Sequence, residues 1–253
     1  MPLYREFALL DNSTTRLPDE STILRFRHLL EKHNLADRIL ALINDMLRDK
    51  GLMLRESTVV DATLIAAPSS TKNSSGKRDP QMHQTKNGNQ WYFGMKEHIG
   101  ADADSGLVHT LRGTPANVNH VAQANALLHI QETDAFGDAG YQGVHKRAVV
   151  PPRVRWHVAV RPGKRAVLDK SKRINSLTDQ VERIKASIRA QAEHPFRVIK
   201  RQFDFVKVRY RGLKKNTAQL TTLFALSNLR MARAKLLRYS SVSTSGAREY
   251  SLK

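Results

Sequence analysis

Residues 57–67, with the sequence STVVDATLIAA, are the feature that most constrains the fold. The run is rich in β-branched and apolar residues, which predicts a buried strand. Strand, hairpin and helix patterns follow it in a fixed order. A hairpin is expected over 90–112, a helix over 119–130, and short strands over 135–138 and 156–160. This order predicts an α/β protein whose mixed sheet is flanked by helices.

Helical spacing of apolar residues appears at both ends of the chain. Residues 18–50 predict two helices, while 170–203 and 217–238 predict long helices in a basic C-terminal region. Pro195 has no backbone donor, so we expect it to start a new helix or to kink the preceding one. Polar residues 68–89 predict a loop, and the serine-rich residues 240–246 predict disorder. We therefore expect a helical segment over 1–56, an α/β domain over 57–238 and a disordered tail over 239–253.

The charge of the chain is distributed unevenly. Forty-two basic and 23 acidic residues give a net charge of +19. Residues 139–253 carry 27 basic and six acidic side chains, whereas 57–138 carry six and eight. Such an excess predicts a polyanionic partner, and we expect a nucleic acid. The densest basic stretch is interleaved with aromatic residues and is our candidate phosphate-binding segment. It contains Arg197, Lys200, Arg201, Lys207, Arg209, Arg211, Lys214 and Lys215.

Three carboxylates occupy unusual places. Asp61 lies inside the apolar strand, Asp138 lies at the end of another strand before a glycine-rich turn, and Glu193 lies in the most basic helical stretch. Burial of an acid is costly unless it is paired or binds metal. Oxygen ligands without cysteine suit Mg²⁺ or Mn²⁺, and two such ions can support phosphodiester displacement. From the residues alone, the alternative is a strand-end cap, a turn residue and an ion pair between Glu193 and Arg189.

Several motifs, in order along nearly the whole chain, carry a family resemblance. They are VDAT at 60–63 leading to Ala67-Pro68, QWYFGMK at 90–96, GDAGYQG at 137–143, Arg189-Ala190 and EHPFR at 193–197 with Lys200, and YRGL at 210–213 with Lys215-Asn216. The sequence resembles the bacterial insertion-sequence transposases with a DDE active site, in particular the IS-five branch of the IS-four-like group.

This resemblance implies an RNase H-like core with Asp61, Asp138 and Glu193 as metal-binding catalytic residues. It also implies a signature around the glutamate, which Arg189 and Lys200 match, while Ala186 stands where the family has tyrosine. The implied reaction is DNA cleavage and strand transfer at element ends with two Mg²⁺ or Mn²⁺ ions, by a homodimer on DNA. No small-molecule cofactor and no membrane are implied.

Family members usually begin with about 60–80 further residues, so the resemblance implies a truncated N-terminus. Two alternatives therefore stay open: a non-catalytic DNA-binding remnant and a general RNase H-like nuclease. The absence of cysteine and of a long apolar run predicts a cytoplasmic protein. The resemblance implies a bacterial protein that is associated with the nucleoid through DNA.

Other candidate site residues have simpler interpretations. Four histidines suggest metal, but they do not share the spacing of a helix face, and we expect structural or surface roles for them. They are His98, His109, His120 and His129. Asp102 and Asp104 flank a predicted hairpin turn, where aspartate is a good turn residue.

Overall fold

The computed structural model describes residues 18–129, 131–146 and 154–249, and of residues 239–249 only the backbone. The chain divides into two compact units, residues 1–35 and 36–253. The first contains α2 (Glu20–Lys32), which begins at Asp19, whose carboxylate accepts a hydrogen bond from the amide of Thr22. None of the residues of α2 is buried. The boundary between these two units lies after residue 35. From the sequence, we expected the N-terminal helical segment to extend to residue 56.

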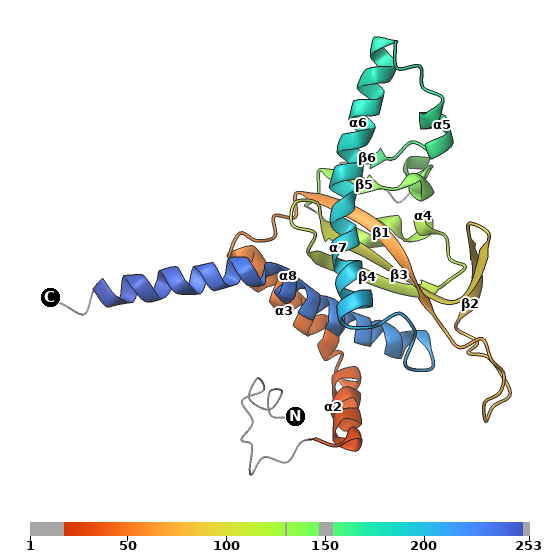
Figure 1. Cartoon of the computed structure of the whole chain (residues 1–253). Helices are drawn as coiled ribbons and strands as arrows, with labels where there is room; N and C mark the ends of the chain where they lie inside the picture. Colours follow the sequence, from red (N-terminus) through yellow and green to blue (C-terminus); the bar gives the residue numbers. More distant parts are fainter. Residues whose placement is uncertain (1–17, 130, 147–153, 250–253) are drawn as a thin grey trace. The chain divides into compact units, whose positions relative to one another are not determined.

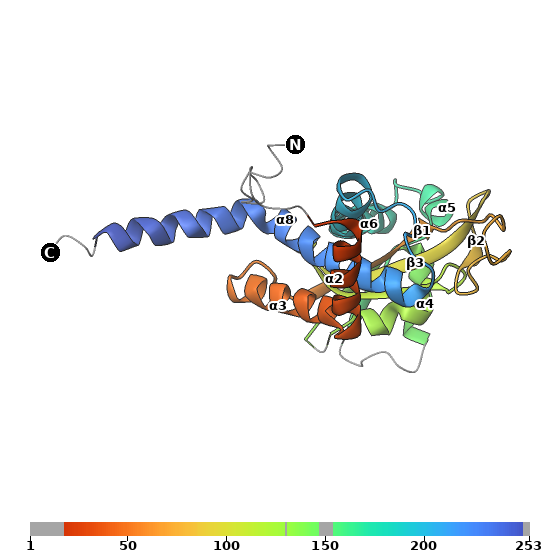
Figure 2. The same cartoon turned by 90° about the horizontal axis from the view of Figure 1, so that it is seen from below.

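Helix α3 (Leu35–Asp49) belongs to the second unit because it packs with the catalytic region. Its Leu47 is fully buried in an apolar cluster with Leu107 and Ala232. Buried Asn44 and Asn228 are hydrogen-bonded to each other at 2.8 Å, and both donate to the carbonyl of Val108. The two figures show α3 beside α8 (Figures 1 and 2).

A six-stranded mixed sheet forms the centre of the second unit. Strands β4, β3 and β1 are antiparallel neighbours, whereas β1, β5 and β6 are parallel. The bounds are β1 Ser57–Ala66, β3 Gln90–Asp102, β4 Val108–Pro115, β5 Asp134–Gly137 and β6 Arg155–Val158. This mixed α/β arrangement is consistent with an RNase H-like fold, so the predicted fold class is confirmed.

Strand β2 (His83–Asn87) falls inside the segment that we expected to be a loop. It pairs with the first residues of β3 through a turn at Gly88, whose φ is +58°. Four of its five residues are exposed, so it lacks the alternation of apolar and polar residues that marks a half-buried strand. The prediction of a loop is wrong for residues 83–87. It agrees with the structure for residues 68–82.

Apolar residues cover both faces of the sheet. Val59 packs in a cluster with Phe196, Ile199 and Phe224, while Val60 packs on the opposite face with Tyr141. The second face is covered by short segments: α4 His120–Gln123, η1 Ala124–Leu127, η2 Ala139–Tyr141 and η3 Val144–Lys146. The helix predicted over 119–130 is therefore shorter; it begins after the N-cap Asn119 and tightens into a 3₁₀ turn.

A long helical run crosses the first face of the sheet (Figure 1). After α5 (Pro162–Ala166), it consists of α6 Arg173–Arg189, η4 Ala190–Ala192, α7 Glu193–Arg197 and the π-helical turn η5 Val198–Gln202. Pro195 lies in the first turn of α7, where a missing donor is tolerated, and the 3₁₀ segment η4 precedes it. The sequence correctly predicted a new helical segment at this proline.

The last helix, α8, runs Leu213–Glu249. Its backbone continues past residue 238, where we expected the domain to end, into residues 239–249 of the predicted tail; residues 250–253 lie outside the described residues. Among the helices that the structure describes, none combines the length and the apolar character needed to cross a membrane.

Candidate active site

The register of two parallel strands brings the first two carboxylates to one edge of the sheet. Ser57 lies opposite Asp134 and Val59 opposite Phe136 in the β1–β5 pair. The same register places Asp61 level with Asp138, one residue beyond the end of β5. Neighbouring strands are about 4.8 Å apart, so the two aspartates lie close together. Parallel strands from distant parts of the chain thereby create a local excess of negative charge.

Backbone amides orient both aspartates. Asp61 Oδ1 accepts from the amide of Ala62 at 2.7 Å, and Asp138 Oδ1 accepts from the amide of Gly140 at 2.9 Å. A Cβ atom at residue 140 would lie 2.9 Å from Asp138 Oδ1, so glycine permits this close approach. In the described part of the chain, the second oxygen of each aspartate has no hydrogen-bond donor. One oxygen of each carboxylate is thus fixed by a hydrogen bond, and the other oxygen is available to bind a ligand.

Glu193 approaches from the helical run above this edge. Alternation along β1 puts Asp61 on the same face as Val59, which packs against Phe196 of α7. Burial, assisted by the charges of Asp138 and Glu193, raises the pKa of Asp61 to about 7, and the charge of Arg189 opposes this rise. The structure therefore brings together the three acids and one of the predicted basic residues. The Glu193 side chain itself is exposed to solvent.

A pocket of about 490 Å³ opens beside these acids. The pocket follows the edge of β1 from the end of its pairing with β5 to an isolated β-bridge at Ala66. There, the amide of Ala66 donates to the carbonyl of Val206, and its carbonyl accepts from the amide of Val208. Within the described residues, this stretch of the edge has no partner strand. Asp61, Asp138 and Lys200 line the pocket, together with Lys96 and His120. An open strand edge with acids and bases can admit a charged substrate.

Lys200 lies in the π-helical turn η5 and is partly buried. Burial lowers the pKa of its ammonium group, while the carboxylates of Glu193 and Asp61 oppose that effect. A π-helical turn is often found at a functional site, because its extra residue redirects the side chains that follow. Lys200 therefore lies close enough to feel the charges of Glu193 and Asp61, as Arg189 does to affect the pKa of Asp61. Ala186 is exposed and contributes no aromatic group.

The other predicted DNA-binding residues are exposed basic side chains near the open edge. The segment that carries Lys207 bridges to Ala66 at the end of β1. Buried Asn216 fixes the following residues by accepting from the amides of Arg209 and Tyr210 and donating to two carbonyls. The exposed members of the set are Arg197, Arg201, Lys207, Arg209, Arg211, Lys214 and Lys215.

The loop over 68–82 anchors this basic segment. Asp79 accepts from the amide of Gly212 at 2.6 Å, and Gln81 accepts from the amide of Leu213 at 2.6 Å. These contacts cap the start of α8, where backbone amides lack helical partners. Arg211 donates to Ser75 at 3.0 Å. The loop that had no evident role in the sequence therefore holds the start of α8.

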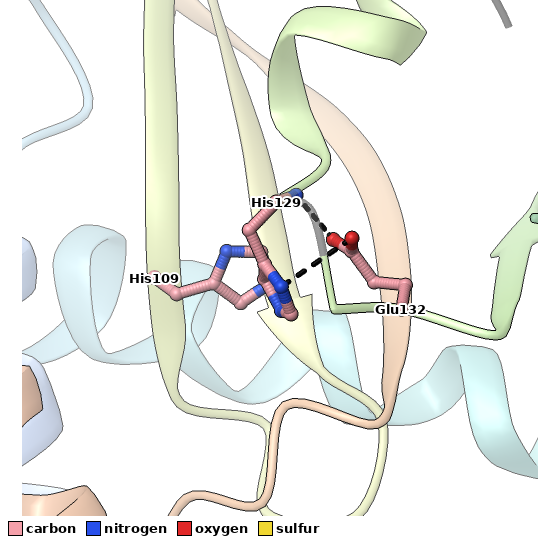
Figure 3. Close-up of side chains that lie close together, drawn as sticks. All are labelled: His109, His129 and Glu132. Carbon is pink, nitrogen blue, oxygen red and sulfur yellow. Dashed lines mark hydrogen bonds and ion pairs between the residues drawn. The ribbon is translucent and has the colours of Figure 1, made fainter. Parts of the chain in front are cut away.

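The donor set of the edge fits Mg²⁺ or Mn²⁺, because it consists of carboxylate oxygens with one oxygen of each aspartate free. In the described chain, one triplet of potential metal ligands has all its ligand atoms within 4.8 Å of one another, and it is His109, His129 and Glu132 (Figure 3).

Sequence reasoning missed this second cluster. We expected structural or surface roles for His109 and His129 because their spacing fits no helix face, but the fold brings them together from β4 and from the segment after η1. His98 instead bonds Thr114 at 2.9 Å, in keeping with a structural role. Asp102 accepts from Ser105 and from the amide of Arg55, as a turn residue does. Only the pairing of strands could have revealed the cluster.

No solved structure matches the chain, whereas comparison with protein families agrees with this arrangement. The family model described as "Transposase DDE domain" matches residues 53–229, which include the sheet, the three acids and the basic segment. The chain therefore belongs to the family of transposases with a DDE domain.

Proposed function

We propose that this chain catalyses metal-dependent cleavage of DNA and transfer of the cut strand at the ends of an insertion sequence. The observation that carries the proposal is the coupling of Asp61, Asp138 and Glu193 at the open edge of β1. We assign the chain to the IS-five branch on the motifs of its sequence. The partner is double-stranded DNA, both element ends and target, in the bacterial cytoplasm and nucleoid.

Asp61, Asp138 and Glu193 would hold two Mg²⁺ or Mn²⁺ ions. When bound, such ions lower the pKa of an attacking water or 3′-hydroxyl and stabilise the leaving oxygen. In each step an oxygen–phosphorus bond forms and the bond from phosphorus to the 3′-oxygen breaks. The chain's own residues position this displacement: the backbone amides of Ala62 and Gly140 fix the aspartates. Fixed geometry matters because misplacement of a reacting group slows the reaction strongly.

Basic residues around the edge would hold the phosphates. Lys200 lines the pocket, and Arg189 lies close enough to affect the charge of Asp61. Arginine binds phosphate oxygens with two parallel hydrogen bonds, and lysine binds them as a point charge. The exposed set from Arg197 to Lys215 extends this surface beyond the pocket. These contacts position the duplex but carry no sequence information.

The test is a strand-transfer assay with labelled element-end DNA. The chain with Mg²⁺ or Mn²⁺ should nick at the element end and join the 3′-hydroxyl to target DNA. Scrambled DNA is the matched substrate control. Binding without cleavage would favour a DNA-binding remnant, and equal cleavage of both substrates would favour a general nuclease.

We also propose that two copies of the chain pair through α6. Its amphipathic pattern is inverted: Asp179 and Glu182 are buried, while Ile174 and Ile184 are 74% and 61% exposed. Asp179 bonds Arg165 at 2.8 Å and Glu182 bonds Lys185 at 2.8 Å, so the acids have partners within the same chain. The exposed apolar residues recur at alternating spacings of three and four, which is the pattern of a self-complementary helical seam. They are Ile174, Leu177, Val181 and Ile184.

Sedimentation of the full chain tests this pairing. The wild-type chain should form a dimer, and Val181→Asn with Ile184→Asn should shift it to a monomer. Ser187→Asn on the same helix is the matched control and should leave the dimer intact. A wild-type monomer, or a dimer that tolerates both apolar substitutions, would contradict the proposed surface.

A further inference from the structure

We propose that His109, His129 and Glu132 form a second metal site, separate from the carboxylate edge, that binds a divalent ion of the zinc type. The ligand atoms of the three residues lie within 4.8 Å of one another (Figure 3). Two imidazoles and one carboxylate, without thiolate, form a ligand set that zinc uses in proteins. The side chain of Glu132 is fully buried and that of His129 is 10% exposed.

The fold builds this cluster on the face of β1 opposite Asp61. Thr58 lies on that face with Val60, and its hydroxyl contacts His109 Nε2 at 3.1 Å and Glu132 Oε1 at 3.0 Å. His109 reaches across β3 because residue 100 is glycine: a Cβ there would lie 2.9 Å from its ring. The main-chain amide of His129 also donates to Glu132. Segments from three parts of the chain thus position the three ligands.

Several hydrogen-bonding groups in the cluster lack partners in the described residues. Glu132 Oε2 and His129 Nε2 are buried and have no hydrogen-bond partner. The amide of Gln131 donates to His129 Nδ1 at 3.3 Å, so this nitrogen presents a lone pair. Glu132 Oε2 lies 3.3 Å from the same nitrogen. Nδ1 is thus occupied by contacts within the protein, and the unpartnered Nε2 is the nitrogen of His129 that is left to bind an ion near Glu132.

The other groups around the cluster are consistent with neutral imidazole ligands. Burial lowers the pKa of His109 well below its usual range and that of His129 to about 4, with the charge of Arg55 acting in the same direction. His109 Nδ1 contacts Thr110 at 2.9 Å, and this contact fixes the ring as partners of metal-binding histidines usually do. Its Nε2 contacts Thr58, and an ion bound there would replace that contact. Arg55 is the nearby cation, yet within the described chain it makes no ion pair with Glu132 within 4.0 Å. It is the competing explanation for the buried carboxylate.

Zinc analysis of the full chain tests the site. The chain is stripped with a chelator, incubated with Zn²⁺, and gel-filtered in millimolar Mg²⁺, which competes for the carboxylate edge. We expect one zinc ion per chain in the wild type and in the Asp61→Asn/Asp138→Asn variant. His109→Gln and His129→Gln should each lower zinc affinity at least about tenfold. His83→Gln, at an exposed position, is the matched control and should retain the ion.

Glu132→Gln guards against loss of folding, because it keeps the side-chain shape and an acceptor for Thr58. It should also lose zinc, while circular dichroism shows a folded chain. Co²⁺ titration provides a second readout, since nitrogen ligands give absorption bands that disappear in the same variants. A wild type without zinc would favour neutralisation of Glu132 by Arg55 and overturn the proposal. Zinc that follows Asp61 and Asp138 instead of the histidines would also overturn it.

Discussion

The two faces of β1 carry two different groups of charged and polar ligands. On one face, Asp61 meets Asp138 and Glu193 at an open edge beside a pocket. On the other face, Thr58 meets His109 and Glu132 in a buried cluster. The first group consists of oxygen ligands beside exposed basic residues, and the second mixes nitrogen and oxygen ligands away from solvent. The open edge is accessible to a large charged substrate and is suited to catalysis. The buried cluster is not accessible and is suited to a structural role.

The difference also appears in how charge is balanced. At the edge, burial and neighbouring acids raise the pKa of Asp61 to about 7, so negative charge is present in excess there. In the cluster, burial keeps the imidazoles neutral, and one oxygen of the single carboxylate accepts from Thr58 and from an amide, while its other oxygen has no hydrogen-bond partner in the described residues. The carboxylates at the edge require cations to function. In the cluster, the proposed ion would instead make the structure more rigid. We therefore expect the two groups to respond differently to the same perturbations.

The largest expected effect follows from loss of a single ligand at the edge. Asp138→Asn keeps the side-chain shape but removes an anionic ligand, so DNA cleavage should fall by about 10³-fold or more. The rate of nicking at the element end measures this. Asp104→Asn makes the same chemical change at an exposed turn and should keep wild-type activity. Near-normal nicking by Asp138→Asn would remove this residue from the proposed site.

Removal of positive charge near the edge should have the next largest effect. Replacing Arg201, Lys207 and Arg209 together by alanine should weaken binding to unrelated DNA sequences alike. Each phosphate contact contributes about 0.9 to the log–log salt slope, so the slope should fall by about 3. Filter-binding titrations over a range of salt measure it.

The matched control removes the same charge from α3 and its end, with Arg38, Arg48 and Lys50 replaced by alanine. This variant should keep the wild-type slope, because its substitutions lie in a segment of zero net charge. An equal decrease of the salt slope in the two triple variants would mean that DNA binding depends on the net charge of the chain and not on the proposed surface.

A smaller effect is expected from pH. Asp61 holds its proton below about pH 7, and a protonated carboxyl binds a cation poorly, so Mn²⁺ affinity should rise with pH up to that value. The gain should be up to about tenfold per pH unit below 7 and should level off above it. Calorimetry in buffers of different ionisation enthalpy should detect proton release at pH 6 and little at pH 8. Affinity that is constant from pH 5.5 to 7.5 would show that Asp61 is already ionised without metal.

Backbone geometry should produce the smallest effect. Gly140→Ala places a Cβ near Asp138 Oδ1 and should disturb the carboxylate without removing it. We expect a partial loss of cleavage, well short of that in Asp138→Asn, with unchanged DNA binding. Gly163→Ala, where a Cβ meets nothing within 4 Å, is the matched control. Full activity in Gly140→Ala would mean that Asp138 tolerates displacement.

The sequence predicted the elements whose patterns are local. The β-branched run of β1, the hairpin at β3 and β4 and the long helices each have apolar periodicity, and the predicted elements agree with them in type. Strand β2 was missed because its residues are mostly exposed, and the attachment of α3 through Asn44 and Asn228 was not predicted because it depends on distant residues. The same reason explains the cluster of His109, His129 and Glu132, whose members meet only after β1, β3 and β4 have paired.

The most direct test of the edge uses the absence of cysteine from this chain. Asp138→Cys introduces a single thiolate, a softer ligand that Mn²⁺ accepts more readily than Mg²⁺ does. If Asp138 binds a catalytic ion, cleavage at the element end by this variant should be lost in Mg²⁺ and recovered in Mn²⁺, whereas the wild type works with both ions. If the variant cleaves equally with both ions, or with neither while its DNA binding and fold are intact, then Asp138 is not the metal ligand that the account requires.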